Sequence, residues 1–65
     1  MSNSELLRAI SELSEAEALV YARFCANIFE KDEDRLRARL METEIENRII
    51  YKLLKRLTKD EEAAR

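Results

Sequence analysis

The sequence predicts an all-α protein, an antiparallel helical hairpin that self-associates into a four-helix bundle. Three observations support this prediction. The 65 residues include no Gly and no Pro, so the tight turns of β-hairpins are disfavoured. Two helix-start signals divide the chain, and apolar residues recur at helical spacing after each of them. We therefore expect one domain over residues 1–65, consisting of two long helical regions.

The first helical region covers about residues 4–30. Residues 2–5 read Ser-Asn-Ser-Glu, a typical helix start, and apolar residues follow at helical spacing. A second start lies inside this region, because residues 14–17 read Ser-Glu-Ala-Glu, the pattern of a capping box. Two arrangements fit: one helix over 4–30, or a short helix at 4–12 and a longer one at 15–30, with a break near 12–14.

The second helix is predicted over about residues 33–59. Asp32 is placed to cap it, and Glu33 and Asp34 then fall in the first turn, where the helix dipole favours anions. Cations accumulate toward residue 59, where the dipole favours them, and we expect residues 60–65 to be frayed. Since residues 30–33 contain no Gly, one continuous helix through 31–34 is the alternative.

Two apolar stripes run along the second helix. The first, the heptad seam, alternates spacings of four and three residues and comprises Leu36, Leu40, Thr43, Asn47, Ile50, Leu54 and Leu57. The second stripe, on roughly the opposite side, comprises Ile45, Ile49 and Leu53. A surface helix needs one apolar face, so two faces indicate two neighbours. We expect the seam to form one interface, intrachain or interchain, and the second stripe to form another with Phe24 and Phe29.

Asn47 occupies an a-type position of the heptad seam. An Asn at such a position fixes register and oligomeric state when it pairs with its counterpart. The alternative is that Asn47 faces solvent or bonds a backbone carbonyl. Glu42 and Glu46 lie beside the seam, and we expect them to pair with Arg39 or with basic residues of another chain.

The chain is short for the apolar surface that it carries. Residues 16–29 are apolar around most of the helix circumference, which is typical of a buried helix. A chain of this length without a disulfide or metal lacks a sufficient core of its own. Its apolar faces are therefore expected to be covered by a second copy or by another protein.

A basic stripe, Arg48, Lys52, Lys55 and Lys59, lies along one side of the second helix. It is either a solvated face or a contact surface for phosphates or an acidic partner. In size and predicted shape the chain resembles the small plasmid-borne helical hairpins that dimerise and bind paired RNA loops. That resemblance includes no shared motif, and it implies a nucleic-acid-binding regulator as the alternative function. Against it, the formal net charge is −2.

Catalysis is the class of function that the composition disfavours most. The chain has no His and one Cys, so it lacks an imidazole base, a Cys–His pair and a Cys-rich zinc site. Glu17, Glu44 and Asn47 have a spacing similar to half of a ferritin-like di-iron site, but Asn47 stands where that family has His. We expect no enzyme activity, cofactor, metal or small-molecule substrate, and we interpret Cys25 as a core residue.

The predicted function is therefore protein–protein contact, through homo-oligomeric assembly or as a regulatory or adaptor module. A third possibility is a small subunit that folds stably only within a larger complex. The expected partners are a second copy of the chain or another helical protein, with nucleic acid less favoured. We expect a cytoplasmic protein, because the sequence shows no signal-peptide pattern and no apolar run long enough to cross a membrane.

Overall fold

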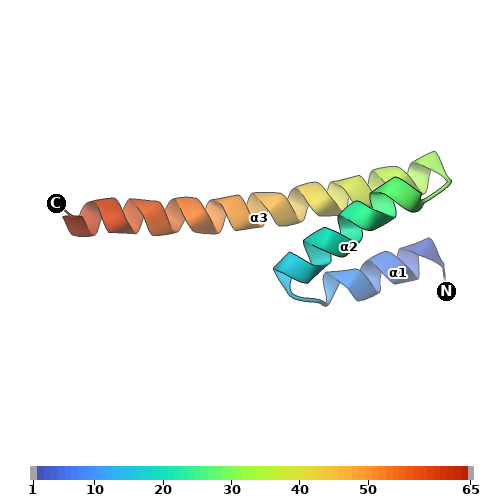
Figure 1. Ribbon diagram of the computed structural model, residues 1–65, viewed down its shortest axis with the longest axis horizontal. Coiled ribbons are helices and arrows are strands. Elements are labelled where there is room, and N and C mark those ends of the chain that lie inside the picture. The colour runs from blue at the N-terminus through green and yellow to red at the C-terminus, as the bar shows by residue number, and fades with distance from the viewer. Residues whose placement is uncertain (1, 65) are drawn as a thin grey trace.

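A computed structural model describes residues 2–64 of the chain, with side chains for residues 2–62. The described part is all-α: α1 spans Asn3–Ser11, α2 spans Glu15–Ile28 and α3 spans Asp32–Ala64, and it contains no strand. The all-α prediction is confirmed. In Figure 1, α2 runs back along the first half of α3, and α1 lies below α2, with α3 above.

The first helical region forms two helices, the second of the two arrangements expected. Helix α1 begins after Ser2, whose hydroxyl accepts a hydrogen bond from the Glu5 backbone N–H at 3.2 Å. It ends at Ser11, and Ser14 then caps α2 by accepting from the Glu17 N–H at 3.4 Å. The capping box differs in one detail, because the Glu17 carboxylate accepts from the Ser14 hydroxyl at 2.9 Å. A local capping signal thus divides residues 4–30 near residue 13.

Helix α3 differs from the predicted second helix at both ends. Asp32 lies in the first turn rather than at the cap and forms an ion pair with Arg35. The helix continues to Ala64, through the residues expected to fray. Because α2 has 14 residues and α3 has 33, they are about 21 Å and 50 Å long, and α2 accompanies less than half of α3. The helices therefore lack the matched lengths of a regular hairpin.

The core lies where the three helices meet, around the alanine-rich face of α2. Ala22 of α2 and Ala38 of α3 have no exposed surface, and small side chains at both positions let the two helices approach closely. The other buried residues are Leu7, Ile10, Ala18, Cys25, Ala26, Phe29 and Ile45. Residues 51–62 contribute nothing to this core, because every one of them is exposed.

The molecule is elongated. Its longest dimension is 52 Å, and its radius of gyration is 15.1 Å, whereas a compact domain of this length has about 11 Å. We call residues 53–62 the overhang, because they continue α3 beyond Lys52, which pairs with Glu15 at the start of α2 at 2.7 Å. In the described residues, no helix combines the length and apolar character that crossing a bilayer requires.

Candidate protein-interaction surface

The heptad seam lies on the face of α3 opposite α2. Its large side chains are exposed: Leu36 by 61%, Leu40 by 63% and Leu54 by 56%, with Ile50 and Leu57 similar. Thr43 and Asn47 between them are exposed as well. The seam is thus an exposed face of α3, apolar toward both ends and polar at Thr43 and Asn47, that the described part of the chain does not cover.

The second stripe belongs partly to the core. Ile45 is buried and Ile49 half-buried, because both face α2, whereas Leu53 lies in the overhang and is 51% exposed. Of the two stripes, the second is therefore the intrachain one over most of its length.

The second interface expected from the sequence does not assemble as one surface. Phe29 is buried at the turn before α3 and belongs to the same core as Ile45, whereas Phe24 is 57% exposed. Two positions five residues apart differ by about 140° around the helix axis, so Phe24 and Phe29 face different ways. Phe24 instead borders a groove between α1 and α2 of about 400 Å³, together with other apolar side chains: Leu6, Ile10, Leu13, Tyr21 and Ile28.

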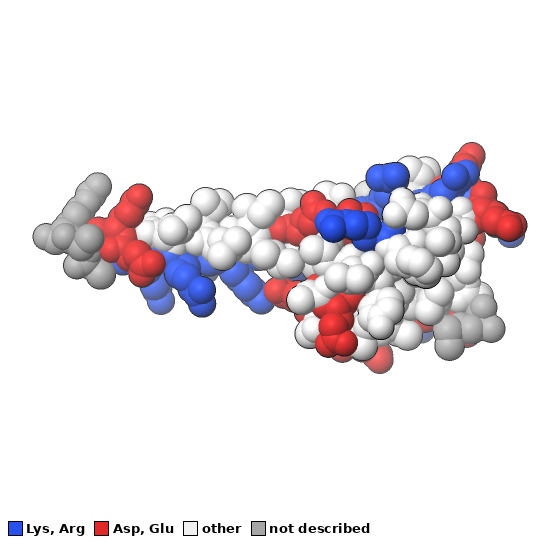
Figure 2. Space-filling view, in the orientation of Figure 1, with Lys and Arg blue, Asp and Glu red and all other residues white. Residues whose placement is uncertain are grey.

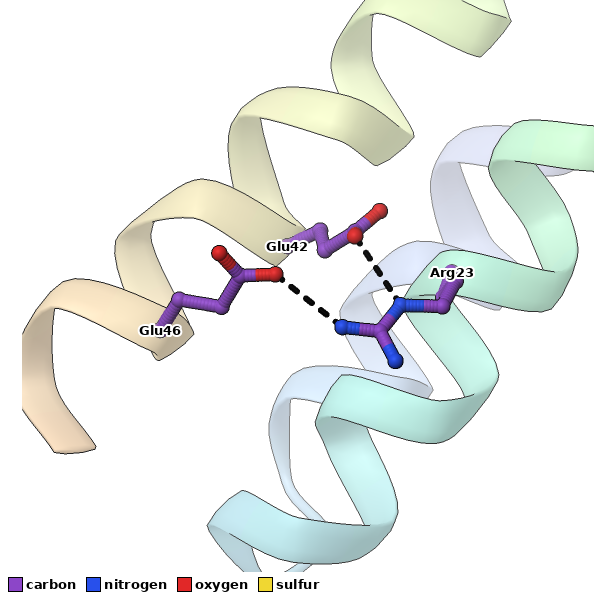
Figure 3. Close-up of polar contacts among 3 residues, drawn as sticks. All are labelled: Arg23, Glu42 and Glu46. Carbon is purple, nitrogen blue, oxygen red and sulfur yellow. Dashed lines mark hydrogen bonds and ion pairs between the residues drawn. The ribbon is translucent and has the colours of Figure 1, made fainter.

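A charged clamp joins α2 to α3 on the exposed edge of their contact. The Arg23 guanidinium donates from Nε to Glu42 at 3.1 Å and from an Nη to Glu46 at 3.1 Å (Figure 3). The hydrogen bond to Glu42, followed by that to Glu46, raises the pKa of Arg23. The expectation for the two glutamates is thereby corrected: they pair with Arg23 of the same chain and not with Arg39. Arg23 was missed because the sequence alone did not place α2 beside these glutamates.

The basic stripe lies on α3 beside the start of α2 and on the overhang. Lys52 pairs with Glu15, and the Lys55 Nζ lies 4.9 Å from the centre of the Tyr51 ring, a cation–π distance. Arg48 and Lys59 are exposed. Figure 2 shows Lys and Arg along one edge of this half of α3 and uncharged residues along the opposite edge.

Cys25 and Glu17 are the two titratable residues of α2 that the sequence analysis considered, one as a core residue and one as a possible metal ligand. Cys25 is buried, and burial raises the pKa of its thiol, which disfavours the reactive thiolate. Glu17 is engaged by Ser14 at the start of α2. Among the described residues there is no group of three His, Cys, Asp or Glu placed to hold a metal ion.

The total solvent-accessible surface is large for the mass of the chain. It amounts to 5447 Å², whereas a compact monomer of 7.7 kDa exposes about 4,300 Å². The excess of about 1,100 Å² exceeds the roughly 800 Å² that one partner contributes to a protein–protein interface of standard size. The elongated shape therefore leaves enough surface for such an interface.

A function can be proposed only from the geometry described above, because the comparisons with known proteins found no match. No family model matches the chain, and neither a curated protein nor a solved structure matches it.

Proposed function

We propose that the protein is a non-enzymatic assembly module that associates with a second copy of itself through the heptad seam. The observation that carries the proposal is the seam itself, exposed along α3 and spaced for knobs-into-holes packing. A seam of this kind matches its own copy, because each apolar side chain inserts between those of an identical helix. The resulting dimer has two α3 helices at its centre and the α1 and α2 of each chain on the outer sides, an assembly of six helices that the overhangs extend.

The number of exposed apolar side chains supports the same proposal. Monomeric proteins rarely expose large apolar patches, since such patches lead to association. The seam contains five large aliphatic side chains at least half exposed in a chain of 65 residues: Leu36, Leu40, Ile50, Leu54 and Leu57. Burying a Leu side chain contributes about 1.5–3 kcal/mol, so several such pairs offset the cost of association.

The decisive experiment compares two charge-introducing variants by light scattering on a sizing column. Leu40 and Val20 are both 63% exposed, and each lies two positions from a fully buried alanine, Ala38 and Ala22, and so on the outer face of its own helix. Leu40→Glu removes two Leu side chains from the seam of a dimer, so we expect the dissociation constant to rise at least about 100-fold. Val20→Glu is the matched control and should remain dimeric. A dimeric Leu40→Glu variant, or a monomeric Val20→Glu variant, contradicts association through the seam.

A second candidate function is contact between the basic stripe and nucleic acid. It is favoured by one observation: the positive side chains of the overhang are exposed along one edge, and residues 47–59 include no Asp or Glu. The test is gel retardation of duplex and hairpin RNA at 50 and 200 mM salt. Binding that weakens with salt and disappears in a Lys55→Glu/Lys59→Glu variant supports this candidate. Absence of retardation at low salt excludes it.

A further inference from the structure

The residues in and beside the heptad seam bear on the relative direction of the two α3 helices in the proposed dimer. Its a positions are Leu40, Asn47 and Leu54, and its d positions are Leu36, Thr43, Ile50 and Leu57. The flanking g and e positions set partner choice and orientation in coiled coils, because their charged side chains meet across the interface. We infer that the two α3 helices of the proposed dimer run parallel and in register. This inference rests on the proposed self-association and assigns its geometry.

The first argument is the pair formed by Arg39 at a g position and Glu44 at an e position. In a parallel, in-register dimer, a g residue meets the e residue five positions later on the partner helix. Arg39 then faces Glu44 of the second copy, and symmetry repeats the pair. Both side chains are exposed, and within the described residues neither has an ion-pair partner in its own chain.

The same rule places Asp32 opposite Arg37 of the second copy, again with opposite charges. These two side chains are already paired within the chain, Asp32 with Arg35 and Arg37 with Glu33. The parallel dimer therefore gains four interchain pairs, two of Arg39 with Glu44 and two of Asp32 with Arg37, and the latter join ion pairs that each chain already contains.

A shift of one heptad reverses this complementarity. Displacing one helix by seven residues sets Asp32 against Glu44, Arg37 against Arg39 and Glu44 against Glu46, and it produces no opposite-charge pair. Like charges at these positions disfavour association. The charge pattern thus selects the in-register pairing over its nearest parallel alternative.

Asn47 provides an independent argument. In register, its amide faces the amide of Asn47 in the second copy, and the two can hydrogen-bond within the seam. In the antiparallel arrangement that still sets the two seams against each other, a positions of one helix meet d positions of the other. Arg39 then pairs with Asp60, but the Asn47 amide meets Ile50. An amide without a partner in an apolar contact is disfavoured, so Asn47 favours the parallel arrangement.

The experiment uses a disulfide as a reporter of orientation. Thr43 is exposed at a d position, so Thr43→Cys in a Cys25→Ala background places two thiols face to face only in the parallel dimer. Helix axes about 8–10 Å apart bring facing Cα atoms within the range that a disulfide spans. In the antiparallel arrangement the two positions are about 11 residues, or roughly 16 Å, apart along the axis. The matched control is Arg48→Cys in the same background, which lies away from the seam.

We expect rapid, nearly complete cross-linking of Thr43→Cys under mild oxidation and little cross-linking of Arg48→Cys. A dimer by mass that does not cross-link at position 43 overturns the parallel arrangement while leaving self-association intact. A chain that is monomeric at all concentrations overturns both.

Charge reversal provides a second readout that does not depend on thiols. Arg39→Glu and Glu44→Arg each turn two attractive contacts into repulsive ones and should weaken dimerisation roughly tenfold. The double variant restores opposite charges and should return the dissociation constant to that of the unaltered chain. Residues 39 and 44 are five positions apart and so are not neighbours on one helix, which makes the rescue specific to the interface. A double variant as weak as the single variants contradicts the parallel arrangement.

Discussion

The complete burial of Ala22 predicts that α2 tolerates no larger side chain at position 22. Ala22 has no exposed surface, so Ala22→Leu forces three additional carbon atoms into a closed part of the helix packing. Overpacking of this kind costs about 1–3 kcal/mol. For a chain of 65 residues, the unfolding entropy converts that cost into a fall in Tm of roughly 7–20 °C.

The matched control is Ala16→Leu, which makes the same chemical change at an exposed position of the same helix. Ala and Leu have similar helix propensities, so this variant should change stability by less than about 0.5 kcal/mol. Thermal unfolding followed by circular dichroism, at one protein concentration for all variants, provides the comparison. If Ala22→Leu melts within 2–3 °C of Ala16→Leu, the close packing of α2 on α3 is refuted.

Three further predictions concern single side chains. Ser14→Ala removes the cap of α2 and should cost about 1 kcal/mol in urea unfolding, and an unchanged midpoint would mean that the cap is not formed. Arg23→Met should cost less than about 1 kcal/mol, because its ion pairs are exposed, and the difference should shrink in 1 M salt. Burial raises the pKa of the Cys25 thiol in the folded chain above its value in the unfolded chain. The contribution of the protonated thiol to the free energy of unfolding is therefore complete at neutral pH, and it decreases as the pH rises through the folded-state pKa. The loss of stability between pH 7 and pH 10 should therefore be smaller in Cys25→Ala, and an equal loss in both proteins would contradict this reasoning.

The elements that depend on local signals were predictable from the sequence. The Ser14–Glu17 pattern marked the place of a break between α1 and α2, with one uninterrupted helix as the other arrangement, and the absence of Gly and Pro indicated an all-α chain. The length of α3 was less predictable, because nothing in the overhang terminates a helix abruptly. Helix ends are set by weak local preferences, and the charged residues 59–62 are compatible with helix.

The choice between the two stripes of α3 could not be made from hydrophobicity, since both are rich in Leu and Ile. The deciding residue is Ala38, which lies seven positions before Ile45 on the same face and gives α2 room to approach. Paired small residues on two helices are a weak signal in a sequence, because alanine is also the best helix former and is common on exposed faces. The ion pairs of Arg23 with its two glutamates form only where α2 packs on this face of α3. They could not be predicted without knowing which face of α3 that is.

Self-association of the unaltered chain is the central claim, and sedimentation equilibrium over a hundredfold range of concentration tests it most directly. The seam predicts a molar mass that rises with concentration to twice the chain mass of 7.7 kDa. A mass of 7.7 kDa at every concentration, from a chain that circular dichroism shows to be folded, would contradict the claim.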